Sequence, residues 1–323
     1  MLLVATLGLT LAVKADFVVR PFYVYPSDQP MHPEYVRSIE SLVLEIQEWY
    51  RERVGTSFQL EPLKVVKGRN YLEMRAGKNP TQEQIDDLQL LPNWWESLQS
   101  ITNGPQPKTV YWVFAQGGGG FAGANLWGDY QGFATFGDWV LEPISGVREP
   151  KAIHSGFATW QVQGGTPKGT TVHELGHAFG LHHPDKYKGM SIMRWHGDYP
   201  DTGLLPHEVM ILRNSPFFVS NAYEADAPWL DFENPDVVRT GQTLVLRGKR
   251  LRAGDEIEFR WTTSPLDSKT ALTERFEKVR CEVLSDTEAK VTVPLSAGPG
   301  FVRAWRGTKK GNVVPVNVYP LEE

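Results

Sequence analysis

The 323-residue chain contains a single cysteine, Cys281. One thiol cannot form an intrachain disulfide, so the sequence excludes a disulfide-stapled scaffold. Long apolar runs are missing as well. The apolar segment 1–13 is too short for a transmembrane helix, which needs about 20 such residues, and no later segment reaches that length. The sequence therefore predicts no membrane span.

An excess of positive charge is also absent. The formal net charge is −5, which gives no electrostatic footprint for binding nucleic acid. No internal repeat, coiled-coil heptad or low-complexity tract is evident. A chain of this length with 41% hydrophobic residues can bury a substantial core and predicts two domains.

What the chain does contain is a dense histidine motif. Residues 173–183 read H-E-L-G-H-A-F-G-L-H-H. Residues four apart on an α-helix share a face, so His173 and His177 can direct imidazole nitrogens at one ion. Gly180 lies where the helix must stop, because glycine tolerates a left-handed backbone. The turn then brings His183 to the same ion as a third ligand.

Three neutral imidazoles leave one open position on a tetrahedral Zn²⁺, as in catalytic sites. Glu174 follows the first ligand, so we expect it to act as general base on the metal-bound water, without being a ligand. An amphipathic helix can carry two histidines by chance, but the added glycine and third histidine weaken that interpretation. We assign no metal ligand among four further histidines, His154, His182, His196 and His207.

At every specified position the segment matches H-E-x-x-H-x-x-G-x-x-H and so resembles the metzincin clan of zinc metallopeptidases, with a bacterial, matrixin-like type favoured. The resemblance implies a methionine turn, for which Met193 is our candidate. Met190 competes with it, and either methionine could instead be core filler. Some branches place a tyrosine ligand two residues later, whereas this chain has Trp195, so we expect no tyrosine ligand. The single cysteine, Cys281, follows the motif in the sequence, so no prodomain thiol can cap the zinc from the N-terminal side. The sequence therefore excludes latency by a cysteine switch.

A glycine-rich run follows the apolar segment 108–116. The resemblance implies an edge strand that pairs with an extended substrate through main-chain hydrogen bonds. The candidate substrate-binding residues are Gly120, Phe121, Ala122, Gly123 and Ala124. A plain surface loop is an equally good interpretation of the glycine-rich run. A P-loop is not, because no Gly-Lys-Ser/Thr follows the glycines. Asp185 is a candidate partner for a ligand ring and equally an exposed turn residue.

The apolar spacing predicts local structure along the chain. Expected strands span 18–25, 59–66, 108–116, 243–247, 256–261, 289–294, 300–306 and 313–318. Expected helices span 33–53, 81–101 with an interruption near residue 92, about 169–180, and 205–213.

The expected fold class is an α+β metzincin-like catalytic domain followed by an all-β sandwich domain. The resemblance gives the first domain, at 16–222, a twisted sheet with an antiparallel edge strand and an active-site helix. The second, at 230–320, has short alternating segments and resembles immunoglobulin-like TIG modules. Segment 1–15 resembles a secretory signal peptide with cleavage after Ala15, although the basic residues that usually begin such a signal are missing. A buried strand is the alternative interpretation of this segment.

These features predict a secreted zinc-dependent endopeptidase with one catalytic Zn²⁺ and a polypeptide substrate. The sequence neither predicts nor excludes structural Ca²⁺, because scattered Asp side chains alone do not identify a calcium site. We expect the C-terminal domain to attach to substrate or to a surface, and we expect no nucleic-acid partner. One alternative is an adhesion or binding protein with a non-catalytic zinc site. Another is a zinc hydrolase for a non-peptide amide, which would need a closed pocket in place of a cleft.

Overall fold

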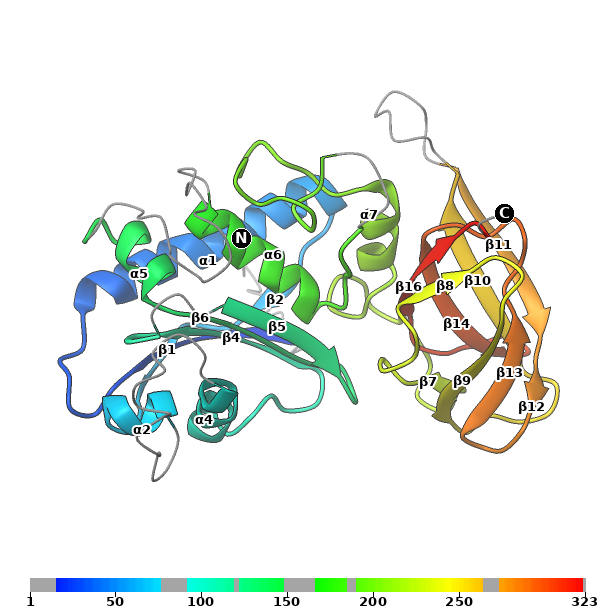
Figure 1. Ribbon diagram of the computed structural model, residues 1–323, viewed down its shortest axis with the longest axis horizontal. Coiled ribbons are helices and arrows are strands. Elements are labelled where there is room, and N and C mark those ends of the chain that lie inside the picture. Colours follow the sequence, from blue (N-terminus) through cyan, green and yellow to red (C-terminus); the bar gives the residue numbers. More distant parts are fainter. Residues whose placement is uncertain are drawn as a thin grey trace, which may run out of the picture.

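The computed structural model describes residues 16–76, 92–118, 122–147, 166–184, 190–263 and 273–321 (Figure 1). The elements before residue 214 are β1 (Val18–Tyr25), α1 (Pro33–Val54), β2 (Gln59–Leu60), β3 (Lys64–Lys67), α2 (Tyr71–Ala76), α4 (Pro92–Thr102), β4 (Thr109–Ala115), β5 (Ala122–Trp127), β6 (Gln131–Phe136), α5 (Asp138–Ile144), α6 (Thr166–Ala178) and α7 (Pro206–Arg213). The predicted signal segment lies outside the described residues, as do Gly120, Phe121, His154 and Asp185.

The first sheet has the strand order β2-β1-β4-β6-β5, and β3 also pairs with β1. Strand β1 runs parallel to β2, β3 and β4, and β4 runs parallel to β6. Only β5 is antiparallel to its neighbour, β6. All seven residues of β4 are buried, as expected for a central strand covered on both faces. Figure 1 shows α1, α5 and α6 on one side of this sheet and α2 and α4 on the other.

The two faces of β4 belong to different cores. Val110, Trp112 and Phe114 pack with α1 and α6, and the residues between them pack with Trp94 and Leu98 of α4. Alternation of side chains along a strand produces this division. A continuous apolar run in the sequence therefore corresponds here to burial on both faces.

The predicted fold class is wrong. The chain is mixed α/β with three multistranded sheets, and not an α+β metzincin-like domain followed by an all-β sandwich. Parallel neighbours need crossover connections, and here the described connections contain α1 between β1 and β2, and α2 and α4 between β3 and β4. The segment-by-segment prediction found several of these strands and helices but could not give their relative direction.

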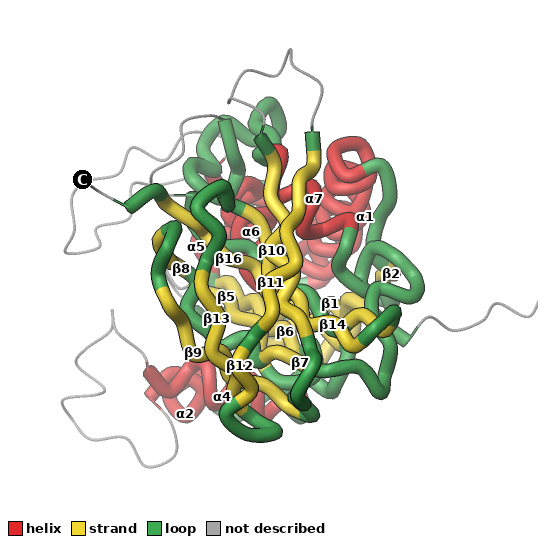
Figure 2. Tube along the Cα trace, turned by 90° about the vertical axis from the view of Figure 1, so that its right-hand side faces the viewer, coloured by secondary structure: helices red, strands yellow, loops and turns green. Residues whose placement is uncertain are grey.

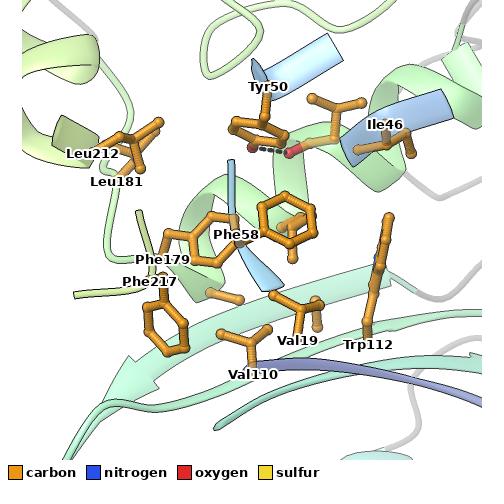
Figure 3. Close-up of a cluster of buried hydrophobic side chains, with 14 of the residues drawn as sticks. Val19, Ile46, Tyr50, Phe58, Val110, Trp112, Phe179, Leu181, Leu212 and Phe217 are labelled. Atoms are coloured by element: carbon orange, nitrogen blue, oxygen red, sulfur yellow. Dashed lines mark hydrogen bonds between the residues drawn. The ribbon is translucent and has the colours of Figure 1, made fainter. Parts of the chain in front are cut away.

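Helix α1 has signals that match its observed ends. Pro33 occupies its first turn, and Gly55 closes it with a φ of 85° while donating its N–H to the Arg51 carbonyl. Its buried stripe includes Ile46 and Tyr50, and Figure 3 shows both within the main core. The Tyr50 hydroxyl donates to the Val172 carbonyl of α6 at 2.9 Å. Helix α1 thus supports the helix that carries the histidine motif.

The C-terminal module comprises residues 229–321. Its strands are β7 (Trp229–Leu230), β8 (Val237–Arg239), β9 (Thr243–Lys249), β10 (Glu256–Thr262), β11 (Glu274–Arg280), β12 (Glu282–Val283), β13 (Glu288–Thr292), β14 (Gly300–Arg306), β15 (Lys309–Lys310) and β16 (Val314–Tyr319). They form two sheets, ordered β11-β10-β14-β16-β8, with β15 also paired to β14, and β12-β13-β9-β7. A separate apolar core contains residues of both. Figure 2 views the molecule from this side.

The C-terminal module shares a core with the rest of the chain. Trp229, Phe301 and Val313 belong to the same buried cluster as the residues of α1 and α6. Tyr130, between β5 and β6, contacts Trp229 edge to face at 5.5 Å between ring centroids. The two regions therefore pack through apolar contacts. Within the described residues, no helix has the length and apolar character needed to cross a membrane.

Candidate metal centre

The motif histidines converge on one point. Helix α6 carries His173 and His177, and Gly180, with a φ of 95°, turns the chain so that His183 reaches them. The Nε2 atoms lie 3.1 Å apart for His173 and His177, 3.0 Å for His177 and His183, and 3.2 Å for His183 and His173. Zn–N bonds of about 2.0–2.1 Å in a tetrahedral site place nitrogens roughly 3.3 Å apart. The three histidines are therefore close enough to bind a metal ion.

Backbone carbonyls orient two of the rings. Nδ1 of His173 lies 2.8 Å from the Ile192 carbonyl oxygen, and Nδ1 of His177 lies 2.7 Å from that of Leu181. A carbonyl can only accept, so each Nδ1 carries the hydrogen and donates it. This tautomer leaves Nε2 with its lone pair free for a cation, as in metal-binding histidines generally.

Burial favours the neutral state that a ligand requires. In the metal-free protein, burial lowers the pKa of His173 to about 2, with the neighbouring His177 as the next cause. Burial likewise lowers the pKa of His177 to about 4. The same effect acts in the opposite direction on Glu174, whose pKa it raises to about 7. Both rings are thus neutral at pH 7, and the Glu174 carboxyl changes its ionisation near that pH.

A turn at residues 191–195 places Met193 beneath α6. The N–H groups of Arg194 and Trp195 both donate to the Ser191 carbonyl, at 3.1 and 3.0 Å. Met193 is fully buried, and a Cβ added at Gly176 would lie only 2.4 Å from its sulfur. Of the two candidate methionines, Met190 is instead 62% exposed. The structure thus brings Met193, and not Met190, against the histidine helix.

A buried carboxyl group joins this turn to α7. The Ser191 hydroxyl donates to Glu208 at 2.8 Å, and the Leu205 N–H donates to the same carboxyl group at 2.6 Å. Ser191 also accepts from the Met193 N–H at 3.0 Å. Glu208 is nearly inaccessible to solvent, and this burial raises its pKa to about 8. The sequence reasoning did not predict this support, because its partners lie far apart along the chain.

Strand β5 is the edge of the first sheet nearest the histidines. It contains three of the predicted substrate-binding residues, Ala122, Gly123 and Ala124, all half-buried. Ala124 also lines a hollow of about 80 Å³ that includes His177 and two residues of the C-terminal module, Phe232 and Pro315. The candidate edge and the metal ligands are therefore adjacent.

Two other histidines, His196 and His182, lie near the three candidate ligands, and the sequence assigned neither of them as a metal ligand. The ring of His196 lies 5.1 Å from that of His173, centroid to centroid, and its buried Nδ1 has no hydrogen-bond partner among the described residues. His182 faces the C-terminal module, with Nδ1 3.9 Å from Asp236. His207 is buried on α7. Only the position of His196, three residues after Met193, could have suggested its proximity to the ligands.

Comparisons with known proteins give no family for the chain. No family model matches it, and no curated protein does. Two crystal structures of wild-type OgpA from Akkermansia muciniphila align with 90% of this chain and 88% and 87% of theirs, at 13% and 14% identity and a TM-score of 0.42 in both cases. A DUF4784 family protein from Bacteroides caccae aligns with 30% of this chain and 23% of its own, at 14% identity and a TM-score of 0.21. Similarity this remote does not support a metzincin-like fold and carries no inference about function.

Proposed function

We propose that this chain is a secreted zinc-dependent endopeptidase. The observation that carries the proposal is the convergence of three histidine Nε2 atoms, 3.0–3.2 Å apart, around one point next to Glu174 in the chain. Three nitrogen ligands, with no fourth ligand beside them among the described residues, correspond to a catalytic zinc site and not to a closed structural one. The motif resemblance to metzincins and the signal-like segment 1–15 support the same proposal.

Bound Zn²⁺ would lower the pKa of a water molecule to about 7 and polarise the carbonyl of a peptide. The chain supplies the proton transfers. Glu174 accepts the proton of the attacking water and returns it to the leaving amine. A pKa of about 7 in the metal-free protein suits this exchange, and a nearby cation would favour the ionised form.

An extended polypeptide would bind along β5. Main-chain groups of Gly123 and Ala124 lie on an edge strand that borders His177, so backbone pairing there would bring a peptide bond toward the ligands. This arrangement favours an open cleft over the closed pocket that a small-amide hydrolase would need. The alternative, a binding protein with a non-catalytic zinc site, gives no use for the half-buried Glu174 carboxyl.

The test compares the purified wild-type chain with Glu174→Ala on a mixed peptide library, with and without a zinc chelator. We expect chelator-sensitive cleavage by the wild type, read by mass spectrometry. The variant should retain one zinc ion per chain and lose hydrolysis, and Glu174→Gln should behave in the same way. Wild-type turnover in either variant would contradict the assigned base. Zinc binding without cleavage in the wild type would favour the binding-protein alternative.

A further inference from the structure

The third ligand has a different setting from the other two. His173 and His177 belong to α6, whereas His183 lies in the loop after Gly180 and has an exposed side chain. A ligand on a loop binds tightly only if the loop is already held in place, since ordering its backbone upon binding costs conformational entropy. The contacts of this loop therefore matter for metal affinity.

The C-terminal module provides one such contact through Asn317 of β16. Its side-chain Nδ2 donates to the His183 carbonyl oxygen at 3.0 Å. Asn317 is 5% exposed, and its own N–H donates to the Asp236 carbonyl at 2.7 Å, where β16 pairs with β8. The strand pairing fixes the amide, and the amide in turn fixes the backbone of the ligand.

Neighbouring residues of the loop contact the same part of the module. The Nδ1 atom of the His182 ring lies 3.9 Å from the Asp236 carboxylate. Pro315 packs on Gly180, where an added Cβ would lie 3.5 Å from the proline ring. Three positions of the loop are thus held by residues more than fifty positions away in the sequence.

We infer that the C-terminal module is a part of the metal centre, and that Asn317 is a positioning residue for the third ligand. By holding the His183 carbonyl, Asn317 keeps the loop in its metal-binding arrangement before the ion arrives. The inference rests on the proposed function, because it concerns the same zinc site. It assigns the module a role beyond attachment to a substrate or a surface.

The experiment measures zinc affinity by competition with a chromophoric chelator, using the full chain and no peptide substrate. We expect Asn317→Ala to weaken zinc binding about tenfold, within the range found when groups that orient metal ligands are removed. Asn312→Ala is the matched control. Asn312 is an equally buried amide whose hydrogen bonds with Leu230 stay inside the module.

Thermal unfolding of the metal-free proteins separates positioning from general destabilisation. Both variants should lose stability, and only the Asn317 variant should lose zinc affinity. If Asn317→Ala does not fold, Asn317→Asp keeps the shape, removes the donor and should show the same loss. Unchanged affinity in the folded Asn317 variant would overturn this inference alone. No zinc binding by the wild type would overturn the proposed metal site and this inference with it.

Discussion

At the scale of single residues, Gly176 is a position inside the motif with little room for a side chain. A Cβ there would lie 2.4 Å from the Met193 sulfur and 3.4 Å from the Tyr50 hydroxyl. Alanine normally favours a helix over glycine by up to about 1 kcal/mol, but a contact of 2.4 Å forces the methionine or the helix to move. Steric fit, and not helix propensity, therefore decides the residue at this site.

We predict that Gly176→Ala lowers the free energy of unfolding by about 1–3 kcal/mol, the usual cost of overpacking. Urea denaturation would measure it. Gly203→Ala is the control, because the nearest atom to an added Cβ there is 3.9 Å away. Adding Met193→Ala to Gly176→Ala should recover part of the loss, since the two side chains would otherwise clash. Strictly additive effects in the double variant would refute the proposed contact.

At the scale of elements, the turn around Met193 depends on Glu208 at the start of α7. Its pKa of about 8 lies above the 4.5 of an ordinary glutamic acid because burial disfavours the charge. A group with a raised folded-state pKa contributes stability that is fully present below pH 4.5 and is lost as the pH rises through about 8. The turn and α7 should therefore become less stable toward alkaline pH.

We predict that the wild type loses stability relative to Glu208→Gln as the pH rises from 5 to about 8, by up to about 1.4 kcal/mol per pH unit. The glutamine cannot ionise, so the difference between the two proteins isolates this carboxyl. Denaturant unfolding at a series of pH values would measure it. Glu233→Gln, at an exposed position, controls for the loss of a negative charge. A constant difference across the range would show that Glu208 is already ionised at pH 5.

Local patterns predicted several elements well. The spacing of apolar residues predicted a helix at 33–53, found at 33–54, and alternation predicted a strand at 18–25, found at the same residues. The helix of the motif begins at Thr166, earlier than the expected 169–171, because hydroxyls such as that of Thr170 bond back to the preceding turn and do not cap it. Strand β6 was missed, and it adds one more parallel pair, with β4, to those that β1 makes with β2, β3 and β4.

In the candidate site, too, local geometry could be predicted from the sequence and long-range contacts could not. The spacing of His173, His177 and His183 follows from one helix and one glycine, so the sequence alone predicts that they converge. The carbonyl that orients His177 belongs to Leu181, four residues further along the chain, whereas the other two supports, the Ile192 carbonyl and Asn317, are distant in sequence. Neither has a sequence pattern that points to the histidines, because each reaches them only through tertiary packing. Helix geometry could be predicted, and the contacts that hold the rings and the loop could not.

At the scale of the whole molecule, Tyr130 joins the two regions. It is 2% exposed and contacts Phe17 and Phe217 on one side and Trp229 and Phe232 on the other, with centroid distances of 5.0–6.0 Å. A shared aromatic cluster of this kind makes unfolding of one region expose apolar surface of the other. The first region and the C-terminal module should therefore unfold together.

We predict one transition for the wild type in differential scanning calorimetry and two for Tyr130→Ala, with an overall loss of about 3–5 kcal/mol as for other large aromatic truncations. Tyr111→Ala is the matched control. Tyr111 is equally buried, but it lies on the opposite face of the first sheet, in a core without residues of the module. Its removal should lower the transition temperature while keeping a single transition. Two transitions in the wild type would mean that the regions unfold independently. In that case the module could hold the His183 loop only while it is itself folded, and zinc affinity would fall with the transition of the module alone.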